Sequence, residues 1–509
     1  MRGAARILSA RESVAAIPSG ATIAVGGFVG AGHPEALSIA LEQRFLELGE
    51  PKGLTLVYGA GQGDRGERGL NHLAHEGLLK RVIGGHWNLA PKLGQLARDN
   101  KIEAYNLPQG VICVLYREIA AKRAGVFTKT GMHSFIDPLH TGGRLNACTT
   151  EALVERVVLD GEVWLRYRTF PIHVALIRAT SADENGNLSL EREGVIGDVL
   201  PIAQAAKNHG GIVLAQVERF VKRIHDPKSV CVPGILVDSI TVAEGTLHSQ
   251  TFGEQFNENY VSAGTAKAPL GILPISERKI IGRRALKEIS PGNVVNLGIG
   301  LPETVASIAQ EKGVLGEFTL TLESGPIGGI PAAGLSFGCS HFPEAILDQP
   351  SQFDFYDGGG LDIAVLGAVE IDAEGSVNVA SFLGRIAGVG GFVNIAQNTR
   401  KLVFCCTFTA GDLEVEVRRG RLHILKEGKY PKFVDRVEQV CFHGPTAIAN
   451  GQQVLYVTER AVFELTTRGL TLREVAPGID PDKDIFPHMG FIPLTANWQL
   501  MPTDCFMNP

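Results

Sequence analysis

One glutamate, Glu323, stands where a carboxylate could perform covalent chemistry. It follows residues 318–322, whose apolar and β-branched side chains predict a strand, and it precedes Gly325, Gly328 and Gly329. Ligands of α/β proteins bind beyond the carboxyl ends of strands, and glycines let a substrate approach the backbone closely. A carboxylate in such a place can attack an activated carbonyl when water is excluded. A helix cap or an exposed surface carboxylate would suit the same position, so position alone leaves these interpretations open.

The elements that must hold this glutamate alternate between strands and helices. Short runs rich in Val, Ile and Leu, separated by helical patterns, predict strands at 22–25, 54–57, 211–215, 293–297, 318–322 and 401–405. Apolar strands of this length between glycine or proline turns are typical of α/β proteins with buried, mainly parallel sheets.

The sequence also repeats itself. Four stretches of the first half match four of the second in the same order, namely 17–26 with 289–298, 54–61 with 318–325, 182–187 with 372–378, and 232–235 with 476–479. This order predicts two related open α/β domains in tandem. We place them at residues 1–268 and 277–509, with the joint near the Ala-, Gly- and Pro-rich stretch 263–276. The strand that ends at Glu323 corresponds to one that ends at Gly59, so the carboxylate marks a difference between the halves.

Composition argues against several other classes of protein. A net charge of −6 gives no general attraction to nucleic acid or to an anionic membrane. Eight cysteines without a C-x-x-C pair predict reduced thiols, and the 14 histidines lack metal-ligand spacing. No apolar run approaches the roughly 20 residues of a membrane-spanning helix. Three arginines before residue 12 hint at a transit peptide, but a strand follows at once, so we expect a first helix of the fold and a cytoplasmic protein.

Four motifs together resemble those of family I coenzyme A transferases. The run from Glu323 to Gly334 is similar to the catalytic glutamate motif of the propionate and acetate CoA-transferases, although Ala333 stands where that motif has glycine. The runs 26–35, 105–110 and 387–392 are similar to the family's N-terminal glycine motif, its Pro-Gln-Gly motif and its Gly-Gly-Phe loop. The resemblance spans both halves and implies α-subunit-like and β-subunit-like CoA-transferase domains fused in one chain.

The resemblance implies that Glu323 moves CoA from an acyl-CoA to a second carboxylic acid. The carboxylate would form an acyl-glutamyl anhydride and then a glutamyl-CoA thioester, which implies ping-pong kinetics. Each addition creates an oxyanion that needs hydrogen-bond donors already in place. The loop from Gly26 to Gly32 and the turn at Gly390 and Gly391 can offer backbone N–H groups, and the resemblance implies that Gly390 or Gly391 is the donor near Glu323. It also implies that the side-chain amide of Gln109 contacts the reacting carboxylates. CoA enters as a substrate, so we expect neither a metal nor a separate cofactor.

The remaining motif residues are expected to bind CoA or the acyl group. They are Gly26, Gly27, Phe28, Gly30, Gly32, Gly325, Gly328 and Gly329. Other interpretations stay open at this point: Phe28 also suits a hydrophobic core, Gln109 also suits a turn after Pro108, and His86 with Trp87 suits a packed pair better than an entrance loop.

Three other functions compete with this hypothesis. An acyl-CoA hydrolase would use the same glutamate with water as the final acceptor, and a non-catalytic protein would bind acyl-CoA without turnover. A nucleotide-dependent oxidoreductase lacks support, because no G-x-G-x-x-G follows the first strand. We expect short-chain acyl-CoAs and small carboxylic acids as partners, and, from the habit of the family, a homo-oligomer such as a dimer or tetramer.

Overall fold

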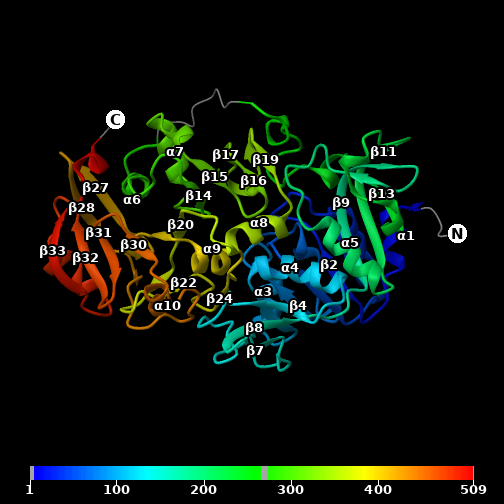
Figure 1. Cartoon of the computed structure of the whole chain (residues 1–509), viewed down its shortest axis with the longest axis horizontal. Coiled ribbons are helices and arrows are strands. Elements are labelled where there is room, and N and C mark those ends of the chain that lie inside the picture. Colours follow the sequence, from blue (N-terminus) through cyan, green and yellow to red (C-terminus); the bar gives the residue numbers. More distant parts are fainter. Residues whose placement is uncertain (1–4, 265–272, 508–509) are drawn as a thin grey trace. The chain divides into compact units, whose positions relative to one another are not determined.

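The computed structural model describes residues 5–264 and 273–507, which belong to two compact units (Figure 1). The first unit comprises Met1–Thr265, Leu322–Asp354 and Gly384–Asn394, and the second comprises Ala266–Thr321, Phe355–Leu383 and Ile395–Pro509. Glu323 and the Gly-Gly-Phe loop therefore belong to the first unit. Much of the predicted joint falls on 265–272, outside the described residues, and the division at 268 and 277 stays a prediction.

The first unit contains a parallel sheet with the strand order β5-β4-β3-β2-β9-β11-β13-β1. The strand order reverses between β2 and β9, which is where open α/β sheets place their ligands. The strands are β1 (Arg6–Ile7), β2 (Thr22–Val25), β3 (Leu54–Tyr58), β4 (Leu79–Gly84), β5 (Glu103–Asn106), β9 (Val174–Asp183), β11 (Ile212–Val221) and β13 (Ser239–Val242), with β10 (Leu188–Ser189) and β12 (Val230–Val232) paired at one end.

Helices and small hairpins complete this unit. The helices are α1 (Ala10–Ala15), α2 (Glu35–Leu48), α3 (Pro91–Arg98), α4 (Gln109–Ala120) and α5 (Val199–Asn208), and the first has the Ser9–Glu12 capping box of a true helix start. An antiparallel sheet is formed by β6 (Gly125–Thr128), β7 (Val154–Leu159) and β8 (Glu162–Arg168). After Glu323 come the paired strands β16 (Pro326–Ile327) and β19 (Ala345–Ile346), the paired strands β17 (Ile330–Pro331) and β18 (Ser340–His341), and later β24 (Arg385–Ile386).

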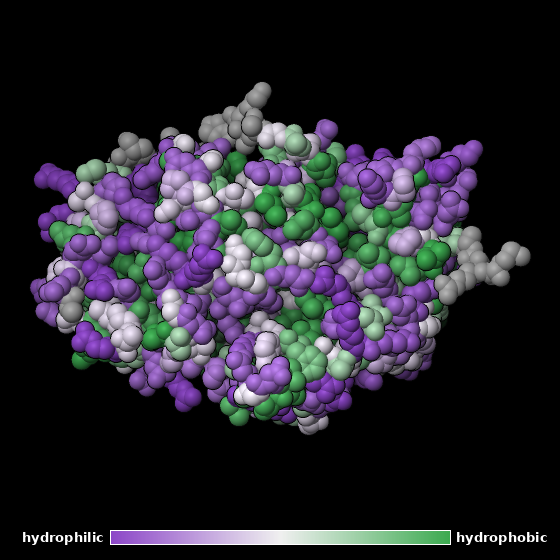
Figure 2. Space-filling model, viewed as in Figure 1, coloured by the Kyte–Doolittle hydropathy of each residue, from purple (hydrophilic) through white to green (hydrophobic). Residues whose placement is uncertain are grey.

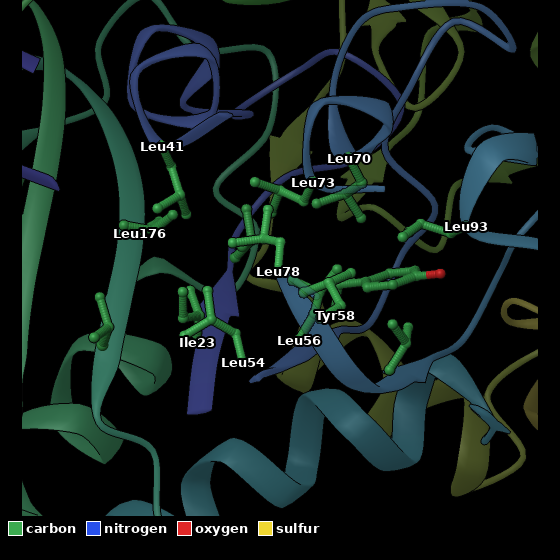
Figure 3. Packing of buried hydrophobic residues seen from close by; sticks show 14 of the residues in the cluster. Ile23, Leu41, Leu54, Leu56, Tyr58, Leu70, Leu73, Leu78, Leu93 and Leu176 are labelled. Carbon is green, nitrogen blue, oxygen red and sulfur yellow. The ribbon is translucent and has the colours of Figure 1, made fainter. Parts of the chain in front are cut away.

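Apolar side chains from these strands and helices form the core of the first unit (Figure 3). Ile23, Leu56 and Leu176 from the sheet pack with Leu41 of α2 and Leu93 of α3, and none is more than 1% exposed. All four residues of β2 are buried, as expected for parallel strands covered on both faces. Burial of each such leucine contributes about 1.5–3 kcal/mol, so the strand ends that carry the motifs are firmly positioned.

The second unit contains a sheet with the strand order β15-β14-β20-β25-β30-β31-β32-β33. Its strands are parallel from β15 to β30, antiparallel from β30 to β32, and parallel again at β33. They are β14 (Val294–Leu297), β15 (Thr319–Thr321), β20 (Ile363–Gly367), β25 (Lys401–Cys405), β30 (Gln453–Val457), β31 (Ala461–Thr466), β32 (Gly469–Val475) and β33 (Leu494–Leu500). Its helices include α6 (Glu277–Leu286), α7 (Thr304–Glu311), α10 (Gly444–Ala449) and α11 (Pro481–Asp484), and the unit boundaries fall within α8 (Gln349–Asp357) and α9 (Phe392–Asn398).

Hairpins extend the second unit. They are β21 (Glu370–Ile371) with β22 (Val377–Asn378), and β27 (Glu414–Arg418) with β28 (Arg421–Lys426). The strands β26 (Thr409–Ala410) and β29 (Tyr430–Pro431), which flank the second hairpin, pair with each other, and β23 (Ser381–Phe382) follows β22.

The two sheets share a topology, as the internal repeat predicts. In the first unit β2 pairs with β3 on one side and with β9 on the other, and in the second unit β14 pairs with β15 and with β20 in the same way. Matching turns follow in both halves. Asp183 Oδ1 accepts the backbone N–H groups of residues 185 and 187, and Asp372 Oδ1 accepts those of residues 374 and 376. The prediction of an α/β protein with two related halves and mainly parallel sheets is confirmed.

The described helices are all too short or too polar to cross a membrane. Figure 2 shows hydrophilic side chains over much of the face in view, with hydrophobic ones scattered among them.

Candidate active site

A tight turn after β15 holds Glu323. The N–H of Gly325 donates to the carbonyl of Leu322 (3.0 Å), and the N–H of Leu322 donates to the carbonyl of Pro326 (2.9 Å). Gly325 has a φ of +123°, and a Cβ there would overlap the carbonyl oxygen of Leu347, so only glycine fits. The hydroxyl of the fully buried Ser324 donates to the carbonyl of Gly338. Ser324 therefore supports the turn, and the neighbouring Glu323 is the reactive candidate.

The Glu323 carboxyl group is poorly solvated although it keeps some access to solvent. Burial among protein atoms raises its pKa to about 7, and a hydrogen bond with its own backbone N–H offsets only part of this effect. Near neutral pH about half of the population is ionised at that pKa. Because a more basic carboxylate donates its electrons more readily, this environment favours nucleophilic attack.

The structure distinguishes the two glycines that the sequence could not separate. The N–H of Gly390 donates to the carbonyl of Gly85 (2.8 Å), and the carbonyl of Gly390 accepts the N–H of Gln109 (2.9 Å). The N–H of Gly391 has no hydrogen-bond partner within residues 5–264 and 273–507. A Cβ on Gly391 would lie 3.4 Å from Cδ of Glu323. Gly391 is therefore the glycine with an available donor beside the carboxyl group.

Gln109 begins α4 and is buried next to Gly390. Its Nε2 donates to Oε1 of Gln349 (2.8 Å), and its Oε1 lies 3.6 Å from the position of a Cβ on Gly390. The Nε2 of Gln349, which is also buried, has no partner in the described chain. One amide proton of Gln109 is thus held by Gln349, which orients the side chain that the sequence singled out.

The carboxyl ends of β4 and β5 hold the Gly-Gly-Phe loop. The side chain of Asn106 accepts the N–H of Val389 (3.1 Å) and donates to the carbonyls of Gly84 and Gly85 (3.0 and 2.6 Å). The N–H of Trp87 donates to the carbonyl of Ala387 (2.7 Å). These bonds fix the loop that carries Gly390 and Gly391, so the buried polar groups are paired as stable interiors require.

His86 and Trp87 differ in their surroundings. Trp87 is fully buried in the core cluster, as the interpretation of a packed pair predicts. His86 instead lies next to the loop, with its Cδ2 3.8 Å from the position of a Cβ on Gly390. Burial lowers its pKa to about 4, so the imidazole is neutral at physiological pH.

The N-terminal glycine loop follows β2 at the point where the strand order reverses. Its N–H groups at residues 26, 28, 29 and 31 donate to protein carbonyls, and those of Gly27, Gly30 and Gly32 have no partner among the residues described. A Cβ on Gly30 would overlap Phe252, and Gly27 packs against Gln62 and His33. Packing therefore explains several of these glycines, and most of the loop's donors are already used within the protein.

Phe28 and two glycines after Glu323 have clear structural surroundings. Phe28 is 4% exposed and packs with Phe337, at 5.9 Å between ring centroids, in a cluster that includes Leu322. It is thus a core residue adjacent to the turn that holds Glu323. Gly328 and Gly329, at φ +75° and +73°, form the turn between β16 and β17 and contact segment 340–344. The atoms nearest to a Cβ on either glycine belong to this segment and not to Glu323.

Comparisons with known proteins show the family of this chain. Residues 7–243 match the family described as coenzyme A transferase. The chain is 46% identical to caffeate CoA-transferase of Acetobacterium woodii, covering 99% of this chain and 97% of that protein. It is 41% identical to acetate CoA-transferase YdiF of Escherichia coli K12, covering 97% of this chain and 94% of that one. This chain belongs to the coenzyme A transferases.

Solved structures support the same assignment. The apoenzyme of acyl-CoA transferase YdiF from E. coli O157:H7 matches the transferase with a TM-score of 0.95 and 40% identity, over 100% of this chain and 97% of that one. A thioester complex of YdiF with CoA matches with a TM-score of 0.94 and 40% identity, over 99% and 96%. The transferase is an acyl-CoA:carboxylate CoA-transferase that contains both halves in one chain.

Sequence reasoning missed two residues that organise this site. Gln349 lies 240 positions from Gln109, and Asn106 lies 283 positions from Val389. Neither residue is of a type that by itself indicates catalysis, and a single amide side chain produces no periodicity or spacing that can be recognised in one sequence. Only Asn106 had a hint in the sequence, because it lies in the run 105–110 whose Pro-Gln-Gly was recognised.

Proposed function

We propose that the transferase moves CoA between short-chain carboxylic acids through a covalent thioester on Glu323. The observation that carries this proposal is the poorly solvated Glu323 carboxyl group, with a pKa raised to about 7, beside the unpaired N–H of Gly391. The proposed nucleophile and the proposed oxyanion donor come from two different segments, the turn after β15 and the Gly-Gly-Phe loop, that contact each other at this point. A nucleophile next to an oxyanion donor is the minimum that acyl transfer requires.

In the first step a carboxylate oxygen of Glu323 attacks the carbonyl carbon of the acyl-CoA thioester. The carbonyl oxygen becomes an oxyanion, and the N–H of Gly391 is placed to stabilise the charge that develops near Glu323. Collapse of this intermediate breaks the C–S bond and releases CoA as the thiolate. The product on the protein is an acyl-glutamyl anhydride.

In the second step the thiolate attacks the glutamyl carbonyl carbon of the anhydride. The first acid leaves as its carboxylate, and Glu323 becomes the γ-thioester of CoA. A second carboxylate then attacks this thioester and the steps run in reverse, which returns the free Glu323 carboxylate. The thioester bond energy is conserved, so the cycle needs no ATP, and Gln109 contributes an amide oriented by Gln349.

The acids are the finer part of this proposal. The similarity to acetate CoA-transferase YdiF supports acetate, propionate and related short acids. The similarity to caffeate CoA-transferase supports a second candidate, a hydroxycinnamate acceptor. Initial rates with propionyl-CoA and either acetate or caffeate compare the two. A higher kcat/KM for caffeate would replace the short-chain proposal.

The mass of the intact protein tests the covalent step. Wild-type protein is incubated with acetyl-CoA or propionyl-CoA without acceptor, next to Glu323→Ala. We expect a CoA-sized mass increase on the wild type alone, located on the peptide that contains Glu323 and removed by added acetate. A CoA adduct on Glu323→Ala, or turnover by that variant at the wild-type rate, would contradict the assignment.

The same experiment separates the alternatives. Steady release of CoA without an acceptor and without an adduct would indicate an acyl-CoA hydrolase, whose site admits water. Tight binding of acyl-CoA with neither an adduct nor turnover would indicate a non-catalytic binding protein. The cytoplasmic location, the homo-oligomeric state and the lack of a resident cofactor stay predictions.

A further inference from the structure

Asp198 stands at the N-terminal end of helix α5 but does not cap it with its side chain. An aspartate at this position ordinarily accepts a hydrogen bond from a backbone N–H of the first helical turn, and a helix without such a bond is less stable. The Asp198 side chain makes no such bond, although its backbone carbonyl accepts the N–H of Ile202 (3.0 Å). The carboxyl group is therefore used for a contact outside its own helix.

That contact is with helix α4. Asp198 is 2% exposed, and its Oδ2 lies 3.6 Å from Sγ of the fully buried Cys113. Burial raises the pKa of Asp198 to about 7, the hydrogen bond with Cys113 opposes this change, and the charge of Asp348 adds to it. About half of these carboxyl groups keep their proton at neutral pH. Asp198 can therefore donate a hydrogen bond as well as accept one.

The thiol of Cys113 connects this carboxyl group to Gln349. Its Sγ lies 3.8 Å from Oε1 of Gln349, and the same oxygen accepts a hydrogen bond from Nε2 of Gln109 (2.8 Å). Gln109 and Cys113 are four residues apart on α4, so they share one face of that helix. A single oxygen of Gln349 thus lies within reach of both side chains.

The charge of Asp198 determines where the thiol proton is donated, because a thiol has only one. A neutral carboxyl group donates its O–H to Sγ of Cys113, and the thiol then donates to Oε1 of Gln349. An ionised carboxylate instead accepts the thiol proton, and Gln349 loses that donor. In the neutral form a continuous series of hydrogen bonds runs from Asp198 through Cys113 to Gln349.

The Gln349 side chain needs this second donor to keep its orientation. Its Nε2 has no hydrogen-bond partner in the part of the chain that the structure describes. The last torsion of a glutamine side chain has a broad preference, so an amide held by one bond can turn over. A thiol proton donated to Oε1 favours the orientation in which this oxygen, and not the NH₂ group, faces Gln109.

The three side chains lie at the carboxyl end of β3, the edge of the sheet where α/β proteins bind ligands. A Cβ on Gly59, which follows β3, would lie 3.1 Å from Sγ of Cys113 and 3.6 Å from Oδ2 of Asp198. Gly59 is the counterpart of Glu323 in the internal repeat. In the first half, the thiol and the carboxyl group therefore fill the space that a side chain would take at the position equivalent to Glu323.

We propose that Asp198 is a positioning residue for the transfer reaction, acting through the Cys113 thiol on the Gln349 amide that orients Gln109. The inference rests on the proposed function, in which Gln109 offers its amide to the reacting groups. Asp198 acts at a distance from those groups, so its removal changes how well the amide is placed and leaves the binding of acyl-CoA as it was.

The rate of CoA transfer from propionyl-CoA to acetate tests this series of hydrogen bonds, at pH 6, where Asp198 with its pKa of about 7 is mostly neutral. We expect Asp198→Ala and Cys113→Ala each to lower kcat about three- to tenfold, with little change in KM, because one hydrogen bond is lost. Asp198→Asn and Cys113→Ser supply a donor at the same place, so each should recover most of that loss.

Asp480→Ala is the matched control for the loss of an aspartate at a helix start. Asp480 does cap its helix, α11 in the second unit, by accepting the N–H of Asp482 (3.1 Å). Its replacement should lower the melting temperature and leave kcat unchanged. Melting curves for all the variants separate this structural effect from the loss of kcat expected for Asp198→Ala.

A double-mutant comparison shows whether the effect passes through Gln349. In a Gln349→Leu background, Asp198→Ala should lower kcat no further. The proposal is overturned by an undiminished loss in that background, by Asp198→Ala protein with kcat within about twofold of the wild type, or by Asp198→Asn losing as much as Asp198→Ala. If Asp198→Ala does not fold, Cys113→Ala and Cys113→Ser decide in its place by the same criteria.

Infrared spectroscopy distinguishes failure of this proposal from failure of the Glu323 mechanism, because it needs no turnover. Subtracting the spectrum of the matching Cys113→Ala protein isolates the S–H stretching band of this one thiol among the eight cysteines. The band should shift in Asp198→Ala, since a hydrogen bond changes the S–H stretching frequency. A shifted band without a Glu323 adduct in the wild type would uphold the hydrogen bonds and contradict the covalent mechanism. An unshifted band in a protein that forms the adduct would contradict the role of Asp198 alone.

Discussion

Replacing Gly391 with alanine tests the arrangement of the proposed nucleophile Glu323 and its proposed oxyanion donor. Gly391 does not adopt a left-handed backbone conformation, so alanine fits its φ without strain. The added methyl group would lie 3.4 Å from Cδ of Glu323 and 3.2 Å from the ring of Phe353. Because these are contact distances, no substrate atom could occupy the space between the methyl group and the carboxyl group.

The expected loss of activity follows from this geometry. Loss of one oxyanion donor costs about 10²–10³ in kcat, and a displacement of about 1 Å at a reacting centre can cost about 10². The N–H of residue 391 remains in the variant, but the thioester carbonyl can no longer approach it and Glu323 together. We therefore expect kcat to fall by about 10² or more, with a destabilisation of about 1–3 kcal/mol from crowding at Phe353.

The assay is the rate of CoA adduct formation on Glu323, followed by intact mass, together with steady-state transfer to acetate. Two matched variants serve as controls. Gly390→Ala has room for its methyl group, 3.6 Å from Gln109, but its φ of +53° costs alanine about 1–2 kcal/mol. Gly94→Ala lies in helix α3, 3.6 Å from Arg98, and should gain up to about 1 kcal/mol of stability without altering transfer.

The comparison of the two neighbouring glycines gives the refuting result. Folded Gly391→Ala protein with kcat within about twofold of the wild type would show that nothing reacts in the space beside Gly391. A larger loss in Gly390→Ala than in Gly391→Ala, at equal thermal stability, would assign the donor to the other glycine. Circular dichroism melting curves for all the variants separate loss of fold from loss of chemistry.

Four further predictions follow from the site. The proposed attack requires ionised Glu323, whose pKa is raised to about 7. The rate of CoA adduct formation should therefore fall about tenfold per pH unit below pH 7 and level off above it. A pH–rate profile with its midpoint near 4.5 would contradict the argument that burial raises this pKa. The raised pKa also means that this group's contribution to stability is complete at low pH and is lost as the pH rises through about 7, which pH-dependent melting curves can detect. Gln349→Leu leaves the buried Gln109 amide without its acceptor, so kcat should fall about tenfold with little change in KM. In a Gln109→Ala background the same substitution should cause no further loss of kcat. An equal loss of kcat in that background would mean that Gln349 acts independently of Gln109. Gly85→Ala would overlap the carbonyl of Gly59 and lower the unfolding free energy by about 1–3 kcal/mol, whereas an unchanged melting temperature would show that the strand ends tolerate displacement.

Much of the fold was determined by local patterns in the sequence. The predicted strand at 22–25 matches β2, and the prolines at 34 and 302 precede helices α2 and α7. Buried parallel strands need continuous apolar runs, and hairpin turns need residues such as Asp183 and Asp372 that bond their own backbone. These requirements act within a few residues, so one sequence is enough to recognise them. The predicted strand at 318–322 is shorter in the structure, where β15 ends at Thr321.

The candidate nucleophile was also visible in the sequence, but its surroundings were not. Glu323 was identified from its position after a predicted strand and from the resemblance of its motif. Both are local properties, so they can be recognised in the sequence alone. Only the tertiary structure decided that Gly391, rather than Gly390, has a free N–H, and that Gln349 holds Gln109. These facts depend on hydrogen bonds between segments hundreds of residues apart, which backbone propensity does not determine. The pKa of Glu323 belongs to the same class, since desolvation is set by the atoms that folding gathers around a group.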